Sequence, residues 1–187
     1  MDTLDESARR DLLGHARAAI ARAIGVEDRP RGAPPMPAEA LRAGVFVTLR
    51  IGGRLRGCIG YSEPEFTLAD AVERCAVSAA ISDPRFPSLT PQEFAESDLE
   101  ISVLGSIEPV GHISEIVIGR HGLIAESGRH RGLLLPQVAV EWGWNAAELA
   151  AETCLKAGLR RDAWQDGARL LKFEAEVFGE RNRRLGE

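Results

Sequence analysis

One cysteine, Cys58, lies in the short stretch LRGCIG, with Arg56 two residues before it and Arg50 a little earlier in the chain. A cysteine acts as a nucleophile or a redox group in its thiolate form, and nearby guanidinium groups favour that charged form. Gly57 and Gly60 flank the cysteine, and glycine inside a strand commonly allows a ligand or another backbone to approach closely. We therefore interpret this stretch as a small anion-binding site that contains a reactive thiol.

The opposing interpretation is that Cys58 is a small packed hydrophobic side chain, because free cysteine is among the most buried residue types. A nucleophilic enzyme also needs a base. His121 is the best candidate among the four histidines, since Gly119 and Gly122 flank it, although a single histidine in a hairpin is more often structural. The sequence leaves the catalytic and the packed interpretations open.

A second candidate segment is SDPRFPSLT, which combines two prolines with the acid Asp83 and the base Arg85. The structural interpretation is a rigid turn between a helix and the next element. The functional interpretation puts Asp83 or Arg85 at the rim of the cysteine site. We keep both residues as candidates for substrate binding.

The cysteine must be positioned by a β-hairpin. Alternating apolar residues predict strands over 45–51 and 55–61, joined by a turn that begins at Gly52-Gly53. A two-residue turn would mix charged and apolar side chains on one face, which a half-buried sheet resists. A three-residue turn that includes Arg54 puts the apolar side chains on one face, and we expect that register.

In the three-residue register, the opposite face of the hairpin carries the polar side chains. Thr48 then lies across from Cys58, and Arg50 lies across from Arg56. Like charges that face each other across a strand pair are unfavourable unless an anion lies between them. Thr48 and the two arginines are therefore predicted to line the thiol site.

The remaining elements form no regular alternation of strand and helix, which favours an α+β fold with a mostly antiparallel sheet flanked by helices. Cys75 falls on the apolar side of its predicted helix, so we expect it in the core. The chain is expected to form one domain over 1–187. The predicted elements are helices over 6–24, from Thr67 to residue 81, after Thr90, over 136–142 and from Asn145 to about 157; a loop over 26–37; and strands over 99–103, 116–118, on either side of residues 126–132, and over 171–177.

Composition and charge exclude several functional classes. The formal net charge of −5 disfavours binding to a phosphate backbone. Three widely separated cysteines give no paired metal-ligand spacing and leave an odd count, so we expect reduced thiols and a cytoplasmic protein. The first residues form no secretory signal, and no apolar run is long enough to span a membrane. No nucleotide-binding, protease or hydrolase motif occurs, so no cofactor and no metal are expected.

Six segments together resemble the AMMECR domain family, whose bacterial and archaeal members are called protein A of the AmmeMemoRadiSam system. The resemblance runs in order from about Ala8 to Phe178, and the hexapeptide LRGCIG, residues 55–60, is its most specific part. The segments are LRGCIG, DPRFPSLT, LEISVL, GRHGLI, RGLLLPQVAVEWGW and TCLKAGL. The resemblance implies a larger subdomain with an antiparallel sheet, a smaller subdomain beside it, and LRGCIG near a cleft between them.

The resemblance also implies an association with a Memo-like protein and a radical S-adenosylmethionine protein, but it supplies no reaction. Our leading hypothesis is an accessory enzyme or substrate-handling component of that pathway, acting on a small-molecule or protein substrate. Cys58 would be its thiolate, Arg50 and Arg56 would hold an anion, and His121 would serve as acid or base. The alternative is a non-catalytic adaptor that docks the partner proteins. A regulator that binds nucleic acid is a third class, which the negative charge disfavours.

Overall fold

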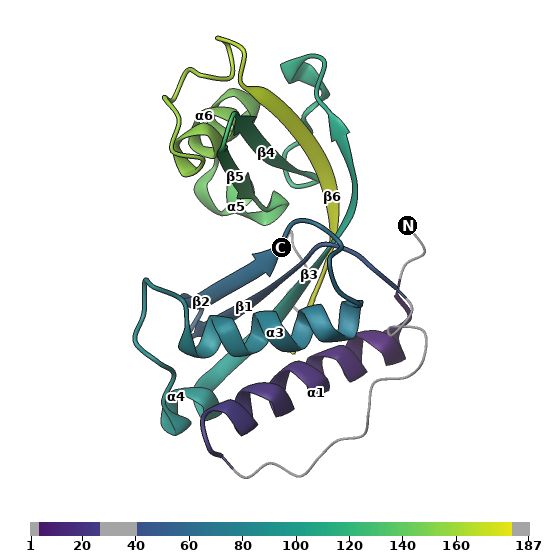
Figure 1. The fold of residues 1–187 in the computed structure, drawn as a ribbon, viewed down its shortest axis with the longest axis vertical. Coiled ribbons are helices and arrows are strands. Elements are labelled where there is room, and N and C mark those ends of the chain that lie inside the picture. The colour runs from purple at the N-terminus through teal and green to yellow at the C-terminus, as the bar shows by residue number, and fades with distance from the viewer. Residues whose placement is uncertain (1–3, 27–40, 181–187) are drawn as a thin grey trace. The chain divides into compact units, whose positions relative to one another are not determined.

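The computed structural model describes residues 4–26 and 41–180. The fold is α+β, as predicted, and its strands form a six-stranded sheet in the order β2-β1-β3-β6-β4-β5 (Figure 1). The predicted loop over 26–37 lies almost entirely outside the described residues. The elements are α1 (Glu6–Ala23), β1 (Val45–Ile51), β2 (Arg54–Tyr61), α3 (Leu68–Ile81), α4 (Pro91–Glu96), β3 (Ser97–Pro109), the 3-10 turn η1 (Ile113–Glu115), β4 (His121–Ser127), β5 (His130–Leu134), α5 (Pro136–Trp142), α6 (Ala146–Lys156) and β6 (Arg169–Gly179).

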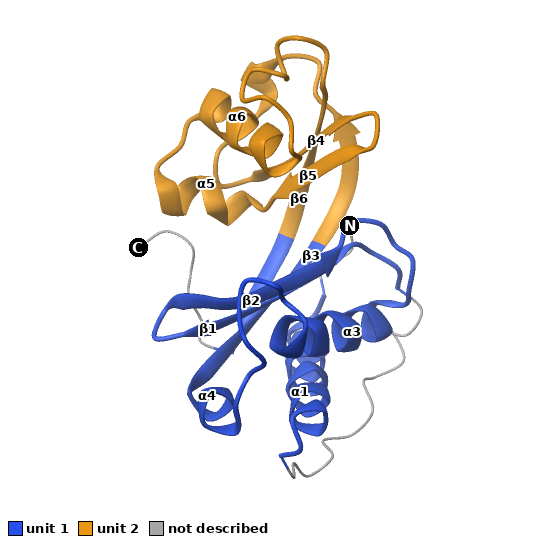
Figure 2. Cartoon of the chain, turned by 60° about the vertical axis from the view of Figure 1, so that its left-hand side comes forward, with its two compact units in different colours: residues 1–103, 176–187 blue, residues 104–175 orange. Residues whose placement is uncertain are grey.

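The chain divides into two compact units, residues 1–103 with 176–187, and residues 104–175 (Figure 2). Both β3 and β6 contribute residues to each unit. The cleft that the family resemblance implies stays a prediction. Within the described residues, no helix combines the length and the apolar character that crossing a membrane requires.

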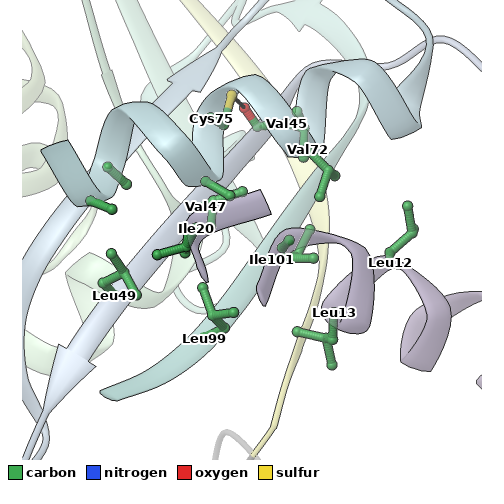
Figure 3. Packing of buried hydrophobic residues seen from close by; sticks show 14 of the residues in the cluster. Leu12, Leu13, Ile20, Val45, Val47, Leu49, Val72, Cys75, Leu99 and Ile101 are labelled. Atoms are coloured by element: carbon green, nitrogen blue, oxygen red, sulfur yellow. Dashed lines mark hydrogen bonds between the residues drawn. The ribbon is translucent and has the colours of Figure 1, made fainter. Parts of the chain in front are cut away.

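The first unit packs helices α1 and α3 against one face of β1, β2 and β3 (Figures 1 and 3). The inward side chains of β1 alternate as predicted, and Val45, Val47 and Leu49 are fully buried. Each helix begins at a side-chain cap: Asp5 accepts a hydrogen bond from the Ala8 amide, and Thr67 accepts one from the Asp70 amide. These caps satisfy backbone donors that a helix start would otherwise leave unpaired.

The β1–β2 hairpin combines features of both registers considered from the sequence. Its turn has two residues, Gly52 and Gly53, with φ values of 57° and 83°. Such a pair of left-handed residues suits a type I′ turn, which glycine adopts without strain. A β-bulge opposite Leu49 and Arg50 then shifts the pairing by one residue. The predicted apolar register therefore holds from Val45 to Leu49.

The bulge corrects one part of the sequence interpretation. Arg50 pairs with Leu55, not with Arg56. Leu55, which was expected on the apolar face, is instead 38% exposed. A bulge leaves one residue without a cross-strand partner. Here that residue is Arg56, so its side chain does not face Arg50.

The second unit packs α6 against β4 and β5. The hairpin that was predicted around residues 126–132 is confirmed as β4 and β5. Asn145 and Glu148 form a capping box at the start of α6. The predicted helix over 136–142 is confirmed as α5. The strand predicted over 116–118 is wrong, because these residues follow η1 and lead into a turn at Gly119, whose φ of 83° is left-handed.

Candidate functional site

The backbone of Cys58 is held from the side of β2 that faces away from β1. The buried carboxylate of Asp83 accepts a hydrogen bond from the Cys58 amide at 2.9 Å. The guanidinium of Arg85 donates to the Cys58 carbonyl at 3.2 Å. The segment after α3 therefore supplies one acceptor and one donor to the same residue.

Asp83 and Arg85 also bind each other. Arg85 Nε and Nη2 lie 2.9 and 2.7 Å from the two carboxylate oxygens, and the Arg85 amide donates to the same carboxylate. The Arg85 side chain holds the pKa of Asp83 well below its usual range, and the Cys58 amide adds to this effect against the cost of burial. Asp83 is therefore a stable carboxylate at neutral pH.

The side chain of Cys58 meets Thr48 across the hairpin. Because the Cys58 amide and carbonyl point away from β1, the Thr48–Cys58 pair is of the non-hydrogen-bonded kind, in which side chains lie closer together. The Thr48 hydroxyl, which is almost fully buried, donates to Cys58 Sγ at 3.3 Å. The predicted approach of Thr48 to Cys58 is confirmed.

Arg56 has partners different from those predicted. Its guanidinium forms a bidentate ion pair with Glu93 on α4, at 2.9 and 3.0 Å, and donates to the Pro87 carbonyl. The Arg56 side chain is 9% exposed, and its Nη1 atom has no hydrogen-bond partner within the described part of the chain. Arg56 is thus a buried link from β2 to α4, and its predicted contact with Arg50 is not formed.

The two glycines of the hexapeptide are explained by close packing. A side chain at Gly57 would lie 2.1 Å from the Ala79 carbonyl oxygen of α3. At Gly60 it would lie 2.3 Å from the Phe46 ring. Both glycines therefore admit neighbouring groups of the protein itself, which was one of the two possibilities raised by the sequence.

Two further guanidinium groups, those of Arg50 and Arg85, belong to strand β1 and to the segment after α3. Arg50 lies two residues from Thr48 on β1, so its side chain starts from the same face of the strand. Its Nη1 donates to the Gly53 carbonyl at 3.4 Å. The Arg85 side chain is half exposed, and its pKa is raised, mainly by its hydrogen bond to Asp83 and further by the nearby Cys58.

The three cysteines differ in exposure. Cys58 is partly exposed, whereas Cys75 and Cys154 are completely buried. Burial raises the pKa of Cys75 to about 12 and also raises that of Cys154. Cys75 Sγ points to the Val45 carbonyl inside the core (Figure 3), as predicted for a packed thiol. Chemistry at a thiol in the folded protein is therefore restricted to Cys58.

The sequence model of the AMMECR1 family matches residues 13–178, which is most of the chain. The chain belongs to the AMMECR1 family. A protein of Methanothermobacter thermautotrophicus is 51% identical over an alignment of 146 residues, and the match covers 74% of this chain and 76% of that protein. A protein of Thermofilum pendens is 46% identical over an alignment of 172 residues, and the match covers 83% of this chain and 80% of that protein.

The AMMECR1 fold is also found in a crystal structure, that of the uncharacterised protein PH0010 from Pyrococcus horikoshii. The TM-score is 0.87 at 40% sequence identity, and the match covers 97% of this chain and 95% of that one. This agreement confirms the predicted family and fold class.

The predicted base of this AMMECR1 domain, His121, lies in the second unit, at the start of β4. Its ring is buried, and Nδ1 accepts a hydrogen bond from the Val117 amide at 3.1 Å. This contact closes the turn before β4, which is a structural use of the ring. Its role as acid or base stays a prediction.

Sequence reasoning missed Glu93 as a partner of the hexapeptide. The signal available was the capping box formed with Thr90, which was predicted and is present. The same carboxylate both caps α4 and binds Arg56, and these hydrogen bonds lower the pKa of Glu93 to about 2. Within the described ranges, no cluster of three or more His, Cys, Asp or Glu side chains is arranged to hold a metal ion.

Proposed function

We propose that this AMMECR1 domain handles an anionic, electrophilic substrate through the Cys58 thiol, as a component of a pathway shared with a Memo-like protein and a radical S-adenosylmethionine protein. The observation that carries the proposal is the hydrogen bond from the buried Thr48 hydroxyl to the partly exposed Cys58 sulfur. A hydroxyl that donates to sulfur stabilises negative charge that develops on it.

The surroundings of Cys58 favour a reactive thiol on a fixed backbone over a thiol that only fills space in the core. Asp83 and Arg85 hydrogen-bond to its backbone from outside the sheet, so the backbone that carries the sulfur is held in place on β2. Rigid support of this kind is what a reacting group requires. Asp83 balances the charge of Arg85, but the guanidinium is half exposed and can donate a further hydrogen bond to a substrate carboxylate or phosphate.

The proposed step is addition of the thiolate to an electrophilic carbon, such as a carbonyl carbon. The sulfur–carbon bond forms, the carbonyl electron pair moves to oxygen, and that oxygen takes a proton from water. The thiol proton leaves to solvent before the addition. The step needs no oxidant or reductant and does not rely on His121.

The test uses two alkylating probes that differ in charge, neutral iodoacetamide and anionic iodoacetate. The reaction of each cysteine is followed by mass spectrometry. In both reactions the sulfur displaces iodide. We expect Cys58 to react in the folded protein and the ratio of iodoacetate to iodoacetamide rates to exceed that of N-acetylcysteine. The Thr48→Val protein should react more slowly with both probes, and Arg85→Gln should lose the preference for iodoacetate.

The matched control is Arg120→Gln, which removes an exposed, ion-paired arginine in the other unit. It should leave both rates unchanged. If Cys58 reacts only after unfolding, the thiol is packed and the proposal fails.

A second candidate function, an adaptor that docks the Memo-like partner, is favoured by one observation. Helix α5 exposes Trp142 at 69% and Val140 at 50%. The Trp142 ring stacks on Trp144, with centroids 5.9 Å apart and planes 16° apart. Exposed tryptophan is enriched among the residues that dominate binding energy at protein interfaces.

The adaptor hypothesis predicts that Trp142→Ala weakens binding of the Memo-like protein by at least about thirtyfold, the effect of losing a dominant interface residue. Leu155→Gln, which removes an exposed apolar side chain from α6, is the control and should bind normally. Equal affinity of the Trp142→Ala protein and the wild type would contradict the adaptor role, and the alkylation results would be unaffected by either outcome.

A further inference from the structure

The end of the β4–β5 hairpin carries a row of charges across three strands. Glu126 on β4 lies directly opposite Arg131 on β5 and directly opposite Arg169 on β6. Arg131 Nη1 is 3.6 Å from one oxygen of the Glu126 carboxylate, and Arg169 Nη1 is 3.2 Å from the other. One carboxylate therefore lies between two guanidinium groups.

This row is on the face of the sheet opposite α6. A side chain at Gly132, the neighbour of Arg131, would collide with the backbone of Ala157 just after α6. Because successive residues of a strand point to opposite faces, Arg131 points away from the helix. The row is correspondingly accessible, and the Arg131 and Arg169 side chains are 39% and 64% exposed.

The three charged side chains line a cavity of about 550 Å³, together with the hairpin turn and the segment that leads into β6. Arg129, in the two-residue turn, adds a third guanidinium to the lining. Gly128 and Gly167 form parts of the rim, and a side chain at either position would meet no atom within 4 Å. The rim is thus open at both glycines.

The lining has a local charge opposite to that of the molecule. Three arginines and one glutamate give a charge of +2, whereas the whole chain has a formal charge of −5. The lining thus carries more positive than negative side chains, and a phosphate monoester carries about −1.5 to −2 charges at neutral pH. Guanidinium groups bind phosphate oxygens in pairs of parallel hydrogen bonds.

We propose that this cavity, the arginine pocket formed by Arg129, Arg131 and Arg169 around Glu126, binds the phosphate group of a small phosphorylated molecule. The limited volume and the overall negative charge favour a small ligand over a nucleic acid, whose long phosphate backbone the rest of the protein repels. The inference is independent of the proposed chemistry at Cys58, because all four residues belong to the second unit.

The test is isothermal titration calorimetry of the full chain with inorganic pyrophosphate, at constant ionic strength. We expect one site per chain. Arg129→Gln and Arg169→Gln should each weaken binding at least about tenfold, because each removes a charged hydrogen-bond donor to phosphate. Glu126→Gln should tighten binding by about threefold or more, because it removes the competing negative charge.

Arg120→Gln is the matched control, since it removes an exposed arginine of the same unit that lies outside the arginine pocket. Arg129→Gln keeps the proposal testable if a change at Arg169 or Glu126 impairs folding, because Arg129 is an exposed turn residue. The proposal is overturned if pyrophosphate fails to bind at millimolar concentration or if Arg120→Gln weakens binding as much as Arg129→Gln does. Tighter binding of a single-stranded RNA oligonucleotide, with displacement of pyrophosphate, would also overturn it.

Discussion

Replacing Asp83 by asparagine should destabilise this protein strongly although the two side chains have nearly the same shape. The Asp83 carboxylate is 3% exposed and accepts four hydrogen bonds, three from Arg85 and one from the Cys58 amide. Each oxygen accepts two of them. An asparagine can offer one oxygen only, and its amide nitrogen would face two donors.

The loss can be estimated from those contacts. Hydrogen bonds to a charged group contribute about 1.5–3 kcal/mol each. Arg85 is half exposed, so solvent screens its share and the lower value applies. Two lost hydrogen bonds then correspond to about 3 kcal/mol of unfolding free energy, a large fraction of the roughly 5–15 kcal/mol typical of a folded domain.

The assay is equilibrium unfolding in guanidinium chloride, followed by circular dichroism between about pH 2 and pH 7. Because the folded-state pKa of Asp83 is lowered, its ionised form is the stabilising one. Its contribution is complete above the unfolded-state pKa of about 3.9 and is lost as the pH falls towards the folded-state value. The stability gap between the wild type and Asp83→Asn should therefore be constant near neutral pH and shrink below about pH 4.

Asp162→Asn provides the control, because Asp162 is an exposed partner of Arg160. Its effect should stay within about 0.5 kcal/mol. A loss below about 1 kcal/mol for Asp83→Asn, or a gap that does not change with pH, would refute the account of Asp83 as the anchor of the Cys58 backbone.

Two other changes test the hexapeptide's packing by the same unfolding measurement. Gly57→Ala should cost about 2–3 kcal/mol, because its methyl group would lie 2.1 Å from the Ala79 carbonyl oxygen of α3. Gly14→Ala, in the open space along α1, should instead stabilise by about 0.5–1 kcal/mol, and equal effects would contradict the packing argument. Glu93→Gln should cost about 2 kcal/mol after screening, because it leaves the buried Arg56 without its charge partner. This cost should fall as the pH drops below about 4, towards the Glu93 pKa of about 2, and a pH-independent cost would argue against the ion pair.

The hairpin shows how far the sequence could predict the fold. The alternation of Val45, Val47 and Leu49 determines which face is buried, so the pairing of Thr48 with Cys58 followed directly from the pattern. The bulge at Arg56 could not be predicted in this way. One extra residue in a strand leaves the sequence of apolar and polar side chains as it was, so no pattern marks the position of the bulge. Its cause is the conflict between a two-residue glycine turn and an apolar register that is offset by one residue.

The candidate site was predictable in part for the same reason. Thr48 and Cys58 come together through local strand pairing, and Asp83 and Arg85 lie in the segment that was singled out by its composition. The ion pair between Arg56 and Glu93 joins residues 37 positions apart. A contact of that kind depends on how α4 docks, which neither periodicity nor capping chemistry specifies.

The hydrogen bonds of Asp83 and Arg85 with the backbone of Cys58 also affect how the protein behaves at high concentration. Strand β2 is at one end of the sheet order, so its outer backbone groups would be available to a strand of another molecule. Asp83 and Arg85 occupy the amide and the carbonyl of Cys58, in the middle of that edge, with a carboxylate and a guanidinium that no incoming strand can replace at low cost. The same pair of side chains that steadies a thiol therefore also protects the sheet against intermolecular strand addition and the aggregation that follows from it.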